Sequence, residues 1–521
     1  MLLMNLKNIR IKLVFNIINS LEMELLHRKP RVLCNFDEFT YNCFKPECEI
    51  LVPLNTTNWI QTIEQNNFDF FFVESTWKPV GKGIRLAYTG ALVTRNKYSY
   101  LKAIIKYLNK KNIPTVFWNK EDNKFFNEFS VYAPLFDYVF TTDQRTLHLY
   151  KRKCKKLKRT KEINTLIFAA QPLLHNPIKD YDFKKYEGDV FFAGAWYNFA
   201  QRMVELKELL TLPRQIKLHI YDRKFDGKKS NFPKEFWYRL KKAVPYKEIC
   251  KKYKRYPIML SVNSVKGSET MFARRVPEAL MCKTSVITTP SISIRKHFPG
   301  VFMKRTNAEV SNSILMLLRN NSFREKHNHV MMRNVLVSHT YFNRMVQICK
   351  TIKVKPPEYK LKVVVLYDNE KVNTFIKEQN YPNIVKSLKI NDNVIDDIFI
   401  NRKVEDKEIE DLGFVVVMNS NYQYGKYYVT DSILSFQFNE HIDIIGKACY
   451  LKKDKYINVN DENRFVNNIS VGSMCVSLKG DLDKRKEKLN FLKKVLKDKK
   501  IPDKHKMNIL SIDRYNFIEM K

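Results

Sequence analysis

The chain has 521 residues, of which 44% are hydrophobic and 13% aromatic, and this composition excludes a disordered protein. Its length is sufficient for roughly two to four domains, each with its own core. The formal net charge of +38 favours an anionic partner: nucleic acid, a membrane surface or an anionic polymer. Lysine is abundant along nearly the whole chain, so the charge does not choose among these partners.

Residues 1–28 predict an amphipathic lead helix. Lys7, Arg10 and Lys12 interrupt its apolar residues and no small-residue cleavage site follows, which makes this segment a poor signal peptide. Such a helix is suited to peripheral contact with the inner membrane surface. No uninterrupted apolar run approaches the roughly 18 residues that a membrane-spanning helix needs.

Residues 29–176 predict a first α/β domain. Short apolar strands are expected at Phe70–Val73, Thr115–Trp118 and Tyr138–Thr141, and Tyr98–Asn109 has the apolar spacing of a helix. This alternation is typical of a parallel sheet covered by helices, where ligands bind beyond the carboxyl ends of the strands. The polar residues at those ends are Glu74–Trp77, Asn119–Asp122 and Thr142–Asp143.

Residues 177–354 predict a second α/β domain, which begins after the boundary at His175–Pro177. Strands are expected at Asp189–Ala195, Ile216–Tyr221 and Ile258–Val262, with helices after Arg202, ending near Tyr256, and throughout 311–354.

Lys355–Pro357 marks a linker to a third domain, residues 355–521. This domain is expected to begin with a strand at Leu361–Tyr367 and to contain a charged helix near Asp481–Lys497.

The nine cysteines are scattered, with no CxxC pair and no cysteine–histidine spacing suited to zinc. Their odd number argues against a full disulfide framework and fits the reducing cytosol. We therefore expect a cytoplasmic protein without a metal centre.

Segment 263–290 reads as a strand end, a polar loop, a helix and a short strand. Glu278 lies in the first turns of that helix, and Arg274 and Arg275 come just before it. A helix N-terminus with adjacent arginines suits a diphosphate, and a nearby carboxylate suits ribose hydroxyls. The segment therefore indicates a nucleotide-sugar pocket, and the alternative is an ordinary helix start with solvated charges.

Gly194 follows a predicted strand, and Arg202 lies in the helix after it. Glycine would let a phosphate approach the main chain, and the arginine would neutralise it. The alternative is a glycine required only by the sterics of the turn.

Glu121 and Asp122 could supply a general base for an acceptor hydroxyl, because carboxylates at a strand end point toward the ligand side of the sheet. The alternative for Asp122 is the N-cap of a helix that begins near Lys124.

Several motifs occur in the order found in one enzyme family. They are Phe117–Asp122, Phe136–Asp143, Phe192–Trp196 with Arg202, Ala273–Cys282, and Ser338–Tyr341 with Arg344. With these motifs the chain resembles the spore maturation protein CgeB-like glycosyltransferases of the group 1 type, over roughly residues 60–345.

This resemblance implies a GT-B fold: two facing Rossmann-like domains, with the acceptor on the first and the nucleotide sugar on the second. It places Gly194 and Arg202 near the donor phosphates, Tyr246 near the base and Glu278 at the ribose. Ser268, Arg274 and Arg275 complete the expected donor site.

Many retaining relatives carry a second glutamate eight positions before the ribose contact. Thr270 stands there in this chain, and Glu269, one position away, becomes a third catalytic candidate beside Glu121 and Asp122.

The third domain resembles the GT-A family 2 transferases at Phe375–Asn383, Tyr424–Asp431, Ile445–Lys447 and Asp513–Phe517. Active relatives hold Mg²⁺ or Mn²⁺ with an aspartate cluster whose place here is taken by Val417–Tyr422, which has asparagines. We therefore predict a catalytically inactive α/β module of GT-A type that binds acceptor or organises assembly.

The sequence thus predicts a hexosyltransferase-like glycosyltransferase that uses a UDP-sugar or another nucleotide sugar and no cofactor or metal. The expected acceptor is an anionic cell-envelope or spore-surface glycan. The alternatives are transfer to modified DNA bases and a non-catalytic scaffold that binds a polymer. The sugar, the stereochemical outcome and the oligomeric state stay open.

Overall fold

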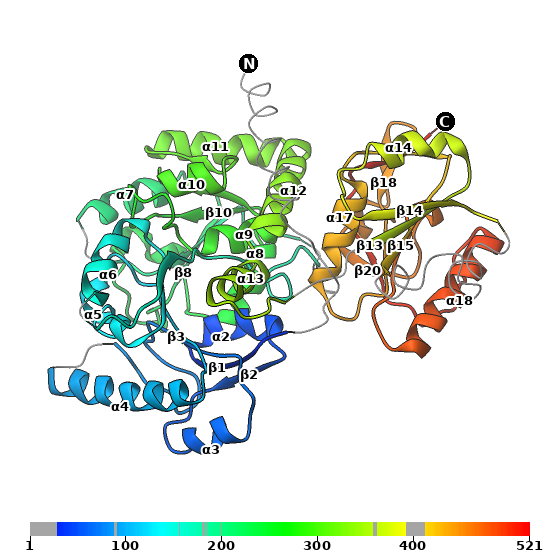
Figure 1. The fold of residues 1–521 in the computed structure, drawn as a ribbon. Helices are drawn as coiled ribbons and strands as arrows, with labels where there is room; N and C mark the ends of the chain where they lie inside the picture. Colours follow the sequence, from blue (N-terminus) through cyan, green and yellow to red (C-terminus); the bar gives the residue numbers. More distant parts are fainter. Residues whose placement is uncertain are drawn as a thin grey trace. The chain divides into compact units, whose positions relative to one another are not determined.

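The computed structural model describes residues 29–87, 91–155, 157–179, 183, 185–197, 200–357, 362–391 and 412–520. The lead helix expected at 1–28 lies outside the described residues. A larger unit comprises Arg28–Pro177 and Phe183–Pro357, and a smaller one contains Glu358–Lys521 (Figure 1). In the described part of the chain, no helix combines the length and the apolar character needed to cross a membrane.

The first half of the larger unit contains a six-stranded sheet in which every pair is parallel, in the order β2-β1-β3-β4-β5-β6. The strands predicted at Phe70–Val73, Thr115–Trp118 and Tyr138–Thr141 are confirmed. The strands are β1 Arg31–Asn35, β2 Ile50–Pro53, β3 Phe70–Glu74, β4 Thr115–Asn119, β5 Tyr138–Thr141 and β6 Glu162–Thr165.

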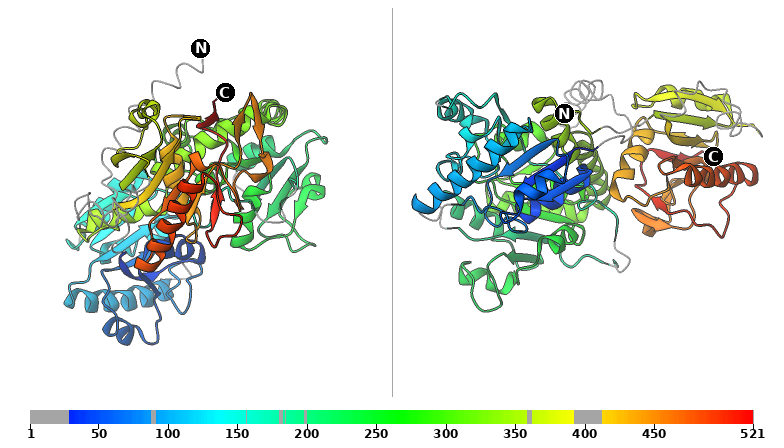
Figure 2. Two further views of the ribbon diagram at one scale, coloured as in Figure 1. Left: turned by 90° about the vertical axis from the view of Figure 1, so that its right-hand side faces the viewer. Right: turned by 60° about the horizontal axis from the view of Figure 1, so that its bottom comes forward.

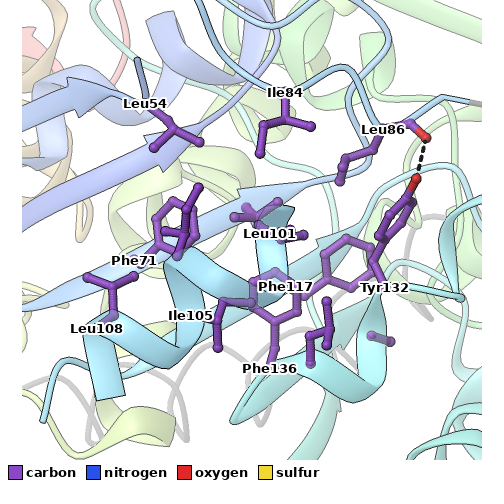
Figure 3. Packing of buried hydrophobic residues seen from close by; sticks show 14 of the residues in the cluster. Leu54, Phe71, Ile84, Leu86, Leu101, Ile105, Leu108, Phe117, Tyr132 and Phe136 are labelled. Atoms are coloured by element: carbon purple, nitrogen blue, oxygen red, sulfur yellow. Dashed lines mark hydrogen bonds between the residues drawn. The ribbon is translucent and has the colours of Figure 1, made fainter. Parts of the chain in front are cut away.

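Helix α4, Ala91–Lys110, includes the predicted helix and covers one face of this sheet. Leu101, Ile105 and Leu108 recur at helical spacing and are buried in one core with Phe71 and Phe117 of the sheet (Figure 3). The other helical segments of this half are α2 Glu38–Phe44, η1 Lys45–Glu47, α3 Trp59–Glu64, α5 Phe126–Phe129, η2 Ala133–Leu135, η3 Gln144–Thr146 and α6 Leu147–Cys154.

The second half has its own six-stranded parallel sheet, in the order β12-β11-β10-β7-β8-β9. Its strands are β7 Val190–Gly194, β8 Leu218–Asp222, β9 Leu240–Lys241, β10 Ile258–Ser261, β11 Ser285–Thr288 and β12 Phe302–Met303. Its helical segments are α7 Ala200–Leu210, η4 Lys234–Arg239, α8 Tyr246–Lys254, α9 Arg275–Met281, α10 Ile292–His297, α11 Asn307–Arg319, α12 Asn321–Ser338 and α13 Tyr341–Ile352.

Helix α13 returns to the first half of the larger unit. Thr340 caps it through a capping box and forms a β-bridge with Ala170. Arg344 Nε donates to the carbonyl of Ile167 at 2.9 Å, and Gln347 Nε2 donates to that of Thr165 at 2.7 Å. The last helix therefore ties the two sheets into one unit, which has the expected GT-B architecture of two Rossmann-like sheets.

The smaller unit contains a mixed seven-stranded sheet, β14-β13-β15-β21-β17-β22-β20, and a four-stranded sheet, β16-β23-β18-β19. Its strands are β13 Lys362–Tyr367, β14 Ile384–Lys389, β15 Leu412–Met418, β16 Tyr422–Tyr424, β17 Ile444–Gly446, β18 Tyr450–Lys452, β19 Lys455–Ile457, β20 Arg464–Val466, β21 Cys475–Ser477, β22 Ile509–Ser511 and β23 Phe517–Glu519. Its helical segments are η5 Glu370–Val372, α14 Asn373–Lys377, α17 Tyr428–Ser435, η6 Phe436–Phe438, η7 Val459–Asp461, η8 Val471–Ser473 and α18 Leu482–Asp498.

Helix α18 is the charged helix that the sequence predicts. Asp481 caps its start by accepting the N–H of Lys484 at 2.9 Å. Leu492 and Val495 are buried in one core with Val415 of β15, so the helix covers the seven-stranded sheet (Figure 2). This unit is thus a third α/β domain.

Candidate active site

Three charged side chains meet at the carboxyl ends of β1, β3 and β4. Lys120 Nζ lies 3.0 Å from a carboxylate oxygen of Asp37 and 3.0 Å from one of Glu74. Glu74 is fully buried, and burial raises its pKa to about 7, although Lys120 opposes this. Asp37 also accepts the main-chain N–H groups of Trp77 and Lys78, which fix the orientation of its carboxylate.

Glu121 lies next to this group and is half-buried. Its main-chain N–H donates to Asn119 Oδ1 at 3.1 Å. Burial raises its pKa, while the positive charges of Lys120 and Arg274 lower it. A partly accessible carboxylate with a raised pKa suits a general base. Arg274 belongs to the other half of the unit, so Glu121 faces the junction of the two halves.

Asp122 points into the core instead. Its carboxylate accepts from Asn119 Nδ2 at 2.8 Å, Thr141 Oγ1 at 2.7 Å and the Tyr150 hydroxyl at 2.9 Å. Only 1% of the residue is exposed, so it presents no free oxygen to an acceptor. Nor is it a helix cap, because the N-cap of α5 is Phe125. The geometry gives Asp122 the task of fixing the loop after β4.

Glu278 of α9 is fully buried in a network of polar side chains. It accepts from the hydroxyls of Tyr253 at 2.5 Å and Tyr246 at 3.3 Å, and it forms an ion pair of 2.9 Å with Arg274. Arg274 lowers the pKa of Glu278 against the effect of burial. In the described structure, therefore, the carboxylate that was expected to bind ribose already accepts hydrogen bonds from two tyrosines and pairs with Arg274.

His175 extends this network. Its Nδ1 accepts the N–H of Gln171 at 3.0 Å, and its Nε2 lies 3.1 Å from the Tyr246 hydroxyl. Burial lowers the pKa of His175 to about 4, so the ring is neutral and its proton is on Nε2. His175 then donates to Tyr246, which donates to Glu278.

Aromatic rings join the two halves beside this network. The guanidinium of Arg274 lies 4.1 Å from the ring centre of Phe39 and 4.9 Å from that of Tyr246. Lys120 Nζ lies 5.0 Å from the same Phe39 ring. Phe39 is therefore the common neighbour of the Asp37–Glu74–Lys120 group and of Arg274.

Tyr197, which follows β7, is contacted by positively charged side chains from both halves of the larger unit. Arg202 lies 5.5 Å, Lys124 5.3 Å and Lys224 6.0 Å from its ring centre, and Arg223 donates to its hydroxyl. Arg202 and Lys224 come from the second half and Lys124 from the first. This concentration of positive charge at a strand end is suited to a polyanionic ligand.

Two arginines of this region, Arg202 and Arg275, have lowered pKa values. Among the described residues, Arg202 Nη1 is buried and has no hydrogen-bond partner. Burial lowers the pKa of Arg202, and the charge of Arg275 lowers it further. Arg275 is half-buried, and burial together with the charges of Arg274 and Arg223 lowers its pKa. An anion would relieve both effects.

The loop after β10 carries the remaining predicted residues. Ser268 is buried, and its Oγ accepts the N–H groups of Thr270 at 3.2 Å and Met271 at 3.0 Å. Glu269 is exposed at 47% of its side chain and pairs with Lys296 at 2.5 Å. The structure thus does not bring Glu269 to the Glu121 group, and Ser268 shapes the loop.

Gly194 ends β7 for a steric reason. A Cβ there would lie 2.7 Å from the ring of Phe192, so a side chain at this position would require that buried ring to move. Its carbonyl accepts the N–H of Arg223 at 3.1 Å, which fixes the start of the segment after β8. The steric alternative for this glycine therefore accounts for it without a phosphate.

The sequence prediction did not include Asp37, Lys120 as an ion-pair partner, Tyr197 or Arg223. Each of them follows a strand directly or closely, so the rule on strand ends would have found them. What the sequence could not show is that they meet in space.

Residues 202–350 match the family model described as "glycosyl transferase-like". The larger unit therefore contains a glycosyltransferase-like domain. No curated protein matches the chain. The matched segment begins at Arg202 and includes Arg274, Arg275 and Glu278.

The chain is also similar in fold to solved structures, among them glycosyltransferases. One, from Rickettsia africae, is 12% identical over 62% of this chain and 89% of that chain, with a TM-score of 0.40. Another is an alpha-glucosyltransferase in complex with UDP-glucose and DNA containing an abasic site, 9% identical over 60% and 96%, with a TM-score of 0.44. A third is HepE from Anabaena in complex with UDP, 12% identical over 62% and 91%, with a TM-score of 0.39. With TM-scores below 0.5, these likenesses do not bear on the substrates of this chain.

Proposed function

We propose that this protein transfers a sugar from a nucleotide-sugar donor to an acceptor hydroxyl at the junction of the two parallel sheets. The observation that carries the proposal is the pair Arg202 and Arg275, two partly buried guanidinium groups. Arg202 Nη1 has no hydrogen-bond partner among the described residues, and burial and neighbouring arginines lower the pKa of both groups. The donor diphosphate would supply the missing negative charge.

In this proposal Glu121 takes the proton of the acceptor hydroxyl, whose oxygen then bonds to the anomeric carbon of the donor sugar. The bond from that carbon to the diphosphate breaks, and the diphosphate leaves with the negative charge. Arg202 and Arg275, with the cations around Tyr197, stabilise this charge. Asp122 and Glu269 take no part, because one is buried in the core and the other is paired with Lys296.

We propose that Glu278 contacts the ribose of the donor nucleotide and that Tyr246 lies near the nucleotide base, as the resemblance implies. Of the two tyrosine hydroxyls that donate to Glu278, that of Tyr246 is the more distant, at 3.3 Å. A ribose hydroxyl would replace it at the carboxylate. Arg274 then stays paired with Glu278 and packed on Phe39.

The net charge of +38 supports an anionic acceptor, which we propose is a cell-envelope or spore-surface glycan. Transfer to a modified DNA base is the second possibility that this charge permits. The nine cysteines are all buried free thiols, which supports a cytoplasmic site of action.

The smaller unit is proposed to be an inactive GT-A-like module. At the carboxyl end of β15 the expected aspartates are Asn419 and Asn421, and the Asn419 Oδ1 accepts the Asn421 N–H at 2.9 Å. Asp368 is held by Ser420, whose N–H and Oγ donate to it at 2.8 and 3.0 Å. The carboxylates for a strong divalent-cation site are therefore few at this position.

A panel of UDP-, GDP- and TDP-sugars tests the proposal through nucleotide release and calorimetric binding. Arg202→Ala should weaken binding of the correct donor about 10- to 100-fold, since one charge-assisted hydrogen bond contributes about 1.5–3 kcal/mol. Arg214→Ala, at an exposed arginine, is the matched control and should bind as the parent does. The proposal fails if no nucleotide sugar binds, or if the two variants behave alike. A steep salt dependence of duplex-DNA binding would favour the DNA acceptor.

A further inference from the structure

The smaller unit contains a cavity of about 480 Å³, formed by residues that the proposed transfer does not use. This volume is typical of small-molecule sites. The walls come from β18, from η7 and from β20 with the residues that follow it. All the described residues that line the cavity thus come from one stretch of the chain, between Ala448 and Ser470.

The walls carry planar polar groups. Asn458, Asn467 and Asn468, whose side chains are amides, and Asp461, whose side chain is a carboxylate, are among the residues that line the cavity. Asn458 is oriented by a hydrogen bond of 3.2 Å from its Nδ2 to the carbonyl of Ala448. Amides offer both donors and acceptors, which is what the hydroxyl groups of a sugar ring require.

Aromatic rings supply the apolar part of the lining. Phe465 is exposed at 45% and lies on β20 among these polar groups. Tyr450 is fixed by edge contacts with Tyr422 at 6.0 Å and Phe517 at 5.3 Å. An accessible ring face suits the C–H groups of a sugar, whose other atoms are polar.

Ser470 gives a separate sign of a missing ligand. It lines the cavity, and its Oγ is buried without a hydrogen-bond partner among the described residues. A buried hydroxyl without a partner is unfavourable, and buried polar groups in native proteins are usually satisfied. A ligand hydroxyl in the cavity would provide the missing bond.

The charge of the lining selects the class of ligand. Among the described residues that line the cavity, Asp461 is the one with a charged side chain. The chain has a net charge of +38, yet the described residues that line this pocket include no lysine or arginine. Among these lining residues a phosphate or an anionic polymer would meet only the negative charge of Asp461, whereas a neutral sugar would meet asparagines and a ring.

We propose that this cavity is a second carbohydrate site, which binds a neutral sugar unit of a glycan without reacting with it. The site stands independently of sugar transfer in the larger unit, because no residue is shared. It would hold a glycan chain on the protein.

Saturation-transfer NMR on the full chain tests this with D-glucose, D-galactose and N-acetyl-D-glucosamine, each at about 10 mM, where even a millimolar Kd is detected. Excess UDP is present to fill any nucleotide site. At least one sugar should give a signal, and Phe465→Ala and Asn468→Ala should each weaken its binding at least about 5-fold. Both side chains are exposed, so their loss should leave the fold intact.

Tyr456→Ala is the matched control, because this aromatic residue of the same unit is 41% exposed and does not line the cavity. It should bind sugar as the parent does. The proposal is overturned if none of the three sugars binds, if Phe465→Ala keeps the signal, or if Tyr456→Ala loses it equally. A sugar signal in a protein that binds no nucleotide sugar would contradict the proposed transfer alone.

Discussion

The hydroxyl of Thr270 donates a hydrogen bond of 2.8 Å to the main-chain carbonyl of Thr142. The same oxygen accepts the N–H of Gln144 at 2.9 Å. Thr270 follows β10 of the second sheet, and Thr142 follows β5 of the first, so one side chain ties the ligand-binding ends of both sheets together. It does so at the position where many retaining relatives carry a glutamate.

Thr270→Val should remove both bonds and leave the Gln144 N–H and the Thr142 carbonyl without that partner. We expect a loss of about 1–3 kcal/mol in the free energy of unfolding, measured by urea denaturation. Thr270→Ser keeps the hydroxyl and should stay within about 0.5 kcal/mol of the parent. Equal stability of the valine variant and the parent would show that this tie contributes nothing.

Glu278→Gln should destabilise the protein strongly. It removes the fully buried negative partner of Arg274, and an uncompensated buried charge costs about 3–5 kcal/mol. Because 26% of the Arg274 side chain is exposed and water screens its charge, we expect the loss to lie at or below the lower end of this range. Glu248→Gln, which breaks the exposed pair with Lys251, should cost less than about 1 kcal/mol. Thermal unfolding of the two variants gives the comparison, and similar melting temperatures would contradict the role of Glu278.

Glu121 should set the acidic limb of the pH–rate profile. A general base must be ionised, so turnover rises with pH through its pKa, which burial raises above the ordinary 4.5. Glu121→Gln should lower kcat at least about 100-fold and remove that limb. Turnover of Glu269→Gln should match the parent within about 2-fold, since that side chain is exposed and paired with Lys296. The reverse pattern would move the base to Glu269.

Asp122 should make stability depend on pH. Burial raises its pKa from 3.8 to about 7, so the folded state binds the proton more tightly than the unfolded chain does. The resulting stabilisation is complete below about pH 4 and is lost as the pH rises through 7, with an upper limit of about 4 kcal/mol. Asp122→Asn cannot titrate, so its stability relative to the parent should increase between pH 5 and pH 8. Parallel urea curves at both pH values would disprove this.

Much of the fold could be predicted from sequence because local patterns determine it. Phe70–Val73, Thr115–Trp118 and Tyr138–Thr141 are short apolar runs bounded by polar residues, and each forms a buried strand. The spacing of Leu101, Ile105 and Leu108 likewise fixes the face of α4 that packs on the sheet.

The candidate site was predicted less well, because a residue type does not show where its side chain points. Glu121 and Asp122 are neighbours in sequence, yet one faces the junction of the halves and the other is enclosed by Asn119, Thr141 and Tyr150. Glu269 looked equivalent to them and is exposed.

The sequence by itself determined that strands alternate with helices, and that arginines and carboxylates follow the strand ends. Only the tertiary structure decided which of these charges are neutralised. In the folded chain Glu278 pairs with Arg274, and both Asp37 and Glu74 pair with Lys120. Arg202 Nη1 has no hydrogen-bond partner among the described residues. The reason is physical: pairing and burial depend on distances of a few ångströms between segments far apart in the chain, and these distances decide which charge stays available for a ligand.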